Sequence, residues 1–70
     1  MLGKDHPSTA TTYNNIAGVY SDQGEYGKAL QWYQKALKIS EKVLGKEHPN
    51  TIIIVNNIEF IINKLTKNEI

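Results

Sequence analysis

The chain has 70 residues, eight lysines, no arginine, no cysteine and a formal net charge of +1, and 40% of its residues are hydrophobic. This length allows one small domain and excludes most enzymes, and without thiols the fold has to rest on regular helix packing, on association, or on both. The lysines are scattered and form no basic stripe, so the composition predicts no nucleic-acid partner.

A segment of nineteen residues occurs twice, at 2–20 and at 44–62. Nine of the nineteen positions are identical at an offset of 42, including a Leu-Gly-Lys run, a His-Pro pair and an Asn-Asn-Ile run. Self-similarity at a fixed period indicates a repeat architecture, in which each unit buries its apolar face against the next unit. The chain therefore contains one complete repeat and half of a second one.

The first helix is expected at about 7–22. Pro7 suits a first helical turn, where its missing N–H has no partner to lose. Apolar side chains recur at spacings of three and four between Tyr13 and Tyr20, which is the period of a helix. Gly24 then supplies a residue that tolerates the left-handed conformation beyond a helix end.

The second helix is expected at about 25–44, with Gly45 as its end signal. Its apolar residues form one broad face that includes Trp32 and Tyr33, and these aromatic side chains are expected in the core. The lysines from Lys28 to Lys42 project from other faces, where a solvated surface is the simplest interpretation.

The third helix, at about 50–67, is apolar around most of its circumference. Such a helix needs burial on more than one side, and the chain has too few other residues to cover it. We therefore expect self-association as a homodimer through this helix. The residues expected at that interface are Ile53, Ile54, Phe60, Ile61 and Leu65.

Several of these residues stand at the spacings of a known repeat signature. They are Tyr13, Ile16, Ala17, Tyr20, Gly24, Tyr26, Ala29, Tyr33 and Ala36. The chain resembles tetratricopeptide-repeat (TPR) proteins over 2–62, and the LGKDHPST and LGKEHPNT segments resemble the 42-residue kinesin-light-chain-like subclass. The resemblance implies an all-α fold, the TPR helix-turn-helix (alpha-alpha superhelix), with one and a half repeats and three helices in a single domain, 1–70.

The second repeat departs from the signature where it should continue. Glu59 replaces a small residue, Ile62 replaces a tyrosine, and Thr66 and Asn68 stand where glycine and tyrosine would open another helix. Two interpretations stay open: the third helix caps the array, or it docks on another subunit.

TPR proteins are non-catalytic scaffolds that bind peptides on a concave surface, so the resemblance implies a protein or peptide partner. Asn15 and Asn57 are the first candidates for binding it, because the family uses an amide here and an amide can both donate and accept hydrogen bonds. Further candidates on or beside this face are Asn14, Asn56, Thr11 and Asp22. The alternative is that these amides tie neighbouring helices together or face water.

Two large apolar residues replace small or polar ones on this face of the third helix. Ile53 and Phe60 stand where the first repeat has Thr11 and Gly18. They predict either an apolar pocket for a ligand side chain or a self-interface, with Phe60 buried against a partner helix.

No cofactor, metal or catalytic activity is expected. His6 and His48 lie a full repeat apart and no cysteine accompanies them, which makes a poor metal site. Ser8 near His6 lacks a third orienting group. The longest apolar run, 52–55, is far shorter than the roughly 18 residues of a membrane span. We therefore expect a cytoplasmic protein with no membrane partner.

Two functions remain open at this stage. The first is a TPR module that binds an extended peptide and self-associates through its third helix. The alternative is a purely structural self-assembly element, or a fragment of a longer TPR array, with no ligand of its own. One and a half repeats fall short of the three or so that such stacks usually need, which favours association.

Overall fold

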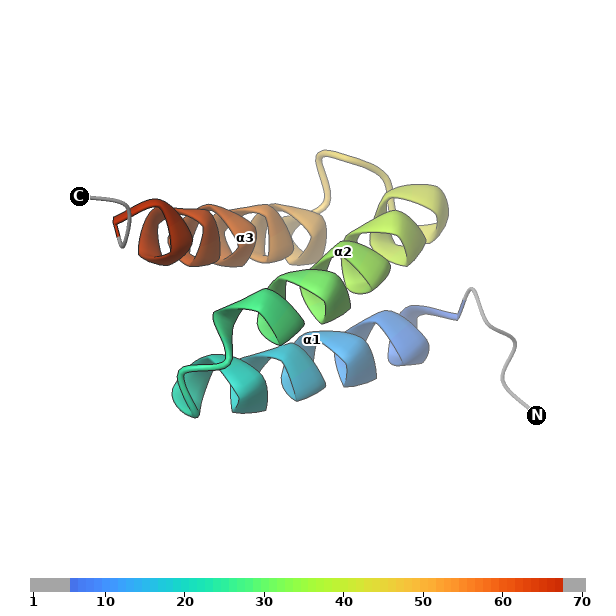
Figure 1. The fold of residues 1–70 in the computed structure, drawn as a ribbon. Coiled ribbons are helices and arrows are strands. Elements are labelled where there is room, and N and C mark those ends of the chain that lie inside the picture. The colour runs from blue at the N-terminus through green and yellow to red at the C-terminus, as the bar shows by residue number, and fades with distance from the viewer. Residues whose placement is uncertain (1–5, 68–70) are drawn as a thin grey trace.

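Three helices make up the fold in the computed structural model, which describes residues 6–67 (Figure 1). They are α1 (Pro7–Asp22), α2 (Tyr26–Val43) and α3 (Pro49–Lys67). The expected all-α helix-turn-helix fold is confirmed, and α2 is one residue shorter at each end than the expected 25–44. Asn68, one of the residues that depart from the repeat signature, lies outside the described residues, as does the first segment's start at 2–5.

The same capping arrangement begins α1 and α3. The His6 Nδ1 atom accepts a hydrogen bond from the backbone N–H of Ser8 at 3.0 Å, and His48 Nδ1 accepts one from the N–H of Asn50 at 3.1 Å. A proline follows each histidine in the first helical turn. The repeated His-Pro pair therefore satisfies a backbone N–H that the helix itself leaves without a partner.

Glycines end α1 and α2 where the sequence predicted them. Gly24 has a φ of +80° and Gly45 a φ of +96°, in the left-handed region that side chains disfavour. Beyond each helix end the chain turns back, with the N–H of Glu25 bonded to the Tyr20 carbonyl at 2.8 Å. These turns set up the reversal that lets α2 pack antiparallel to α1.

Alanines let α1 and α2 approach closely. Ala17 of α1 and Ala29 of α2 belong to one core cluster and have no exposed surface, so no larger side chain separates the two helix backbones there. Larger residues fill the space beside them: Tyr33 is buried, and the Tyr13 ring meets the Trp32 ring edge to face at 5.3 Å. The first repeat is thus a tightly packed helical hairpin.

α3 packs on α2 through a stripe of residues spaced by three and four. Its buried members are Thr51, Ile54 and Ile61, and the hydroxyls of Thr51 and Ser40 share a hydrogen bond of 2.6 Å. Ile54 and Ile61, expected at a self-interface, therefore belong to the core of the single chain. Leu65 is partly buried against that core too. Because apolar residues surround most of α3, the sequence alone could not show which of its faces would pack on α2.

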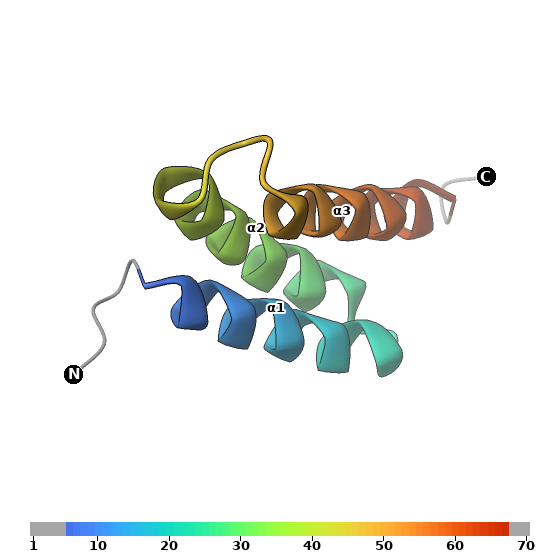
Figure 2. The same ribbon diagram turned by 180° about the vertical axis from the view of Figure 1, so that it is seen from behind.

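The two helices that begin with a His-Pro pair, α1 and α3, run in the same direction, and α2 runs opposite to both (Figures 1 and 2). α2 makes contacts with each of them. The parallel arrangement brings the N-terminal turns of α1 and α3 to the same end of the molecule, where the C-terminal turn of α2 also lies. This end contains the candidate site.

Candidate functional site

A hydrogen bond between two asparagines connects α1 to α3. The amide nitrogen of Asn57 donates to the side-chain oxygen of Asn14 at 3.3 Å, and both residues are half-buried. For this pair the structure shows the bridging arrangement that the sequence left as an alternative. Both helices rest on α2, and this bond adds a direct link between them beside the pocket.

The other two candidate asparagines lie elsewhere. Asn15 is exposed on α1, one helical turn beyond Thr11, and Asn56 is exposed on α3. Asp22 is exposed at the last residue of α1. Asn15, Thr11 and Asp22 share one face of α1 by their helical spacing, whereas Asn14 lies beside that face and turns toward α3.

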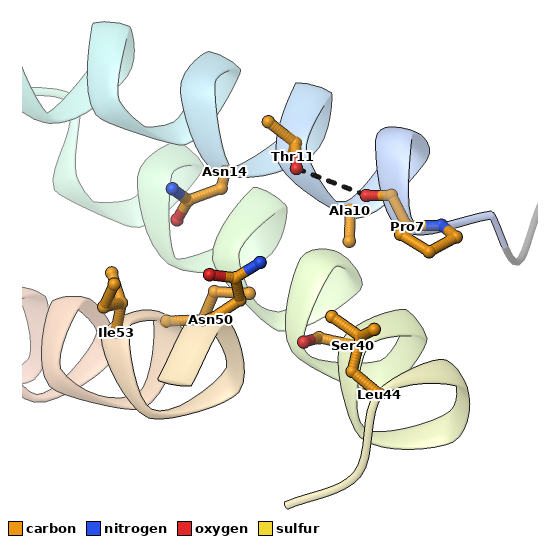
Figure 3. Close-up of a pocket in the computed structure, with 9 residues that line it drawn as sticks. Pro7, Ala10, Thr11, Asn14, Ser40, Leu44, Asn50 and Ile53 are labelled. Atoms are coloured by element: carbon orange, nitrogen blue, oxygen red, sulfur yellow. Dashed lines mark hydrogen bonds between the residues drawn. The ribbon is translucent and has the colours of Figure 1, made fainter. Parts of the chain in front are cut away.

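A pocket of about 280 Å³ lies between the N-terminal turns of α1 and α3 and the C-terminal turn of α2 (Figure 3). Its walls combine apolar and polar side chains from all three helices: Pro7, Ala10, Thr11, Asn14, Ser40, Leu44, Asn50, Ile53 and Ile54. This volume is close to the lower end of the range for small-molecule sites, about 300 to 1,000 Å³, and is large enough to admit a side chain of a ligand.

Polar groups stand on both sides of this pocket. Figure 3 shows Asn14 of α1 and Asn50 of α3 facing each other across it. The Thr11 hydroxyl donates to the Pro7 carbonyl at 3.3 Å within α1. Two amides above a lining of Leu44 and Ile54 can bind a polar backbone while an apolar side chain enters between them.

Sequence reasoning identified Thr11 and Asn14 but missed Asn50. Asn50 follows the second His-Pro pair, where the first repeat has Ser8, so the difference between the two copies is the signal that could have found it. Ile53, expected on the binding face, lines the pocket and keeps 52% of its surface exposed. The pocket therefore contains three residues of the predicted groove and adds Asn50.

Two aromatic side chains, Phe60 of α3 and Tyr33 of α2, lie beyond the pocket, toward the C-terminal ends of α1 and α3. Phe60 is 51% exposed, and the Lys64 ammonium lies 5.3 Å from the centre of its ring. The Tyr33 hydroxyl comes close to Gly18, where an added Cβ would lie 3.9 Å from it. Burial, helped by the Asp22 carboxylate, raises the pKa of Tyr33 above its ordinary value of 10.0.

Among residues 6–67, no three His, Cys, Asp or Glu side chains come together in a way that could hold a metal ion. His6 and His48 instead act as helix caps. Within the same range no helix is both long and apolar enough to cross a membrane.

Comparison with known families identifies the architecture. The family model of the tetratricopeptide repeat matches residues 9–50, which include most of α1 and the whole of α2. No curated protein matches the chain. Because the match covers more than half of the residues, the chain belongs to the tetratricopeptide-repeat family. Such repeats are generally non-enzymatic modules that mediate protein–protein interactions.

Proposed function

We propose that this tetratricopeptide-repeat protein is a non-enzymatic scaffold that binds an extended peptide between α1 and α3. The observation that supports the proposal is the pocket between Asn14 and Asn50, with its apolar lining. An extended peptide has unpaired backbone N–H and C=O groups, and side-chain amides can satisfy both kinds. An aliphatic side chain of the peptide would enter the pocket toward Leu44 and Ile54.

The rest of the groove extends the proposed contact. Thr11, Asn15 and Asp22 lie along one face of α1, and Ile53 and Phe60 lie along α3. A peptide that follows the two helices would pass from the pocket to the Phe60 ring, with Asn15 beside it. Asn57 is no longer the first candidate for binding the peptide, because its side-chain amide already donates a hydrogen bond to Asn14.

Selection from a random peptide library displayed on phage, with the full chain immobilised, tests this proposal. Selected peptides are then titrated calorimetrically against Asn50→Ala, for which we expect a roughly tenfold loss of affinity. Gln34→Ala, on an exposed part of α2, is the matched control and should bind like the parent chain. No enrichment, or equal affinity of the Asn50→Ala chain, would contradict peptide binding at the pocket.

Self-association through α3 is a second candidate. It is supported by Ile53 and Phe60, which are 52% and 51% exposed on the same flank of α3. A homodimer formed there would cover the groove, and the chain would then act as a self-assembly element. Sedimentation equilibrium of the Ile53→Asn, Phe60→Gln chain should then show a helical monomer where the parent shows a dimer. A parent monomer at all concentrations would exclude this candidate.

The kinesin-light-chain-like subclass and the cytoplasmic location stay predictions. The subclass is supported by the 42-residue spacing of the repeated His-Pro caps. One and a half repeats are likewise compatible with a chain that is part of a longer array.

A further inference from the structure

Four lysines form a stripe along α2, although the composition alone predicts no basic stripe. Lys28, Lys35 and Lys42 follow one another at intervals of seven residues, and Lys38 and Gln31 lie beside them at spacings of three and four. All five side chains are exposed, and we call them the lysine stripe. The buried residues of α2 occupy a different side of the helix, so the stripe is open to a partner.

The lysine stripe contains no carboxylate. Glu41 is the one acidic residue within α2, and its helical position lies to one side of the stripe. Among residues 6–67, no carboxylate forms an ion pair with Lys28, Lys35 or Lys38. The charges of these three lysines are therefore left for solvent or for a partner.

Two of these lysines lie over aromatic rings. The Lys28 ammonium lies 5.6 Å from the centre of the Tyr20 ring, and the Lys35 ammonium lies 4.4 Å from the centre of the Trp32 ring. A ring face attracts an ammonium without removing its charge, so both cations can still bind an anion. Because the rings already restrain these side chains, binding an anion costs less conformational entropy than it would at an unrestrained lysine.

We propose that the lysine stripe binds an acidic segment of a partner protein in an extended conformation. From Lys28 to Lys42 the stripe is about 21 Å long at 1.5 Å per residue. An extended segment of about seven residues spans this length, and its alternate side chains lie about 7 Å apart on one side. Such a segment can bring three or four carboxylates to the lysines. This surface goes beyond the peptide groove of the proposed function and shares no residue with it.

Other polyanions fit the lysine stripe less well. No apolar side chain accompanies the lysines, whereas a helix that lies on a membrane buries an apolar face in it. Proteins that bind single-stranded nucleic acids stack bases on aromatic rings, and here ammonium groups lie over the rings of Tyr20 and Trp32. The chain also has no arginine, which is the residue best suited to bidentate phosphate contacts.

A labelled acidic peptide tests this proposal by fluorescence anisotropy with the full chain. The probe has about 12 residues in which glutamate alternates with serine, and the same peptide with glutamine in place of glutamate is its neutral control. We expect only the acidic peptide to bind. Its affinity should fall roughly fivefold when NaCl is raised from about 20 mM to about 150 mM, because salt screens exposed charges. In an NMR titration the amide signals of Gln31, Lys35 and Lys38 should shift.

Two double variants with the same net charge separate the lysine stripe from general attraction. Lys35→Gln, Lys38→Gln should lower the affinity for the acidic peptide about tenfold. Lys64→Gln, Lys67→Gln, in the last turn of α3, should leave it unchanged. Asn50→Ala, in the pocket, should also bind the acidic peptide like the parent chain. Circular dichroism shows whether each variant stays helical.

Four outcomes would overturn the proposal. They are no binding of the acidic peptide, equal binding of the neutral peptide, equal losses in the two double variants, and amide shifts confined to α1 and α3. Vesicles of phosphatidylserine and phosphatidylcholine test the membrane alternative. Binding of the chain to these vesicles through Lys35 and Lys38, without binding of the acidic peptide, would assign the lysine stripe to a lipid surface instead.

Discussion

α1 and α3 are two copies of one half-repeat that differ in which of their faces the chain itself covers. Both begin with a histidine cap and a proline, and both pack on α2. α1 presents Ala10 and Ala17 to α2, whereas α3 presents Ile54 and Ile61 and leaves the flank of Ile52 and Ile62 exposed. The caps and the fold thus come from the shared positions, and the differing positions decide the surfaces open to partners.

The largest difference in stability between the two copies is expected when Ala17 and its counterpart Glu59 are each replaced by the residue of the other copy. Ala17→Glu should unfold the chain, because a buried, unpaired carboxylate costs about 3 to 5 kcal/mol, which is the whole stability of a domain of this size. Glu59→Ala should change the free energy of unfolding by about 0.5 kcal/mol or less, since Glu59 is exposed. Urea unfolding followed by circular dichroism measures both, and an equal loss in the two variants would contradict the assignment of the two faces.

Neighbouring isoleucines on α3 give the next largest contrast. Ile61 has no exposed surface and Ile62 is 44% exposed. Ile61→Ala should lower the free energy of unfolding by about 2 to 5 kcal/mol, because it leaves a cavity against α2. Ile62→Ala should lower it by only about 0.5 kcal/mol. Urea unfolding measures both free energies. A larger loss of stability in Ile62→Ala than in Ile61→Ala would mean that α3 is rotated about its axis.

The hydroxyl pair between α2 and α3 gives a smaller effect that depends on both partners. Ser40 and Thr51 are each 1% exposed, and their hydroxyls bond at 2.6 Å. Ser40→Ala should cost about 1 to 3 kcal/mol, because it leaves the buried Thr51 hydroxyl without its partner. Adding Thr51→Val should restore most of that loss. A double-mutant cycle from unfolding free energies measures the coupling, and simple additivity of the two losses would contradict it.

The smallest expected effect is the response of stability to alkaline pH. Burial and the Asp22 carboxylate raise the pKa of Tyr33 above 10.0, so the folded chain binds the phenol proton more tightly than the unfolded chain. The stability contributed by the neutral phenol is therefore fully present below pH 10 and is lost as the pH rises through the raised pKa. Thermal unfolding between pH 9 and pH 11 should show a weaker decline in Tyr33→Phe than in the parent chain. An identical decline would show that Tyr33 does not contribute.

Much of the fold could be predicted because its signals are local. The His-Pro pairs, the glycines after the first two helices and the alanine spacing each act within a few residues, and the repeat doubles the signal for α1 and α3. The fold class follows from these signals without any knowledge of the packing. The rotation of α3 about its axis does not, since its apolar residues surround it and only contact with α2 selects the stripe of Ile54 and Ile61.

The site could be predicted only in part, because it depends on the distance between two helices that are far apart in the sequence. Helical spacing predicted that Thr11 and Ile53 lie on the binding face, and both residues line the pocket. It could not show that Asn57 would reach Asn14, or that the first turn of α3 would bring Asn50 across from α1. Those relations arise from the way both helices rest on α2, which no local pattern encodes.

An NMR titration of the full chain with a peptide selected from the random library tests the central claim most directly. We predict that the amide signals of Asn14, Asn50 and Ile53 shift in proportion to the bound fraction, while those of Ile52 and Ile62, on the flank of α3 opposite to Asn57, stay unchanged. Shifts confined to that flank of α3 or to the exposed side of α2 would contradict peptide binding between α1 and α3.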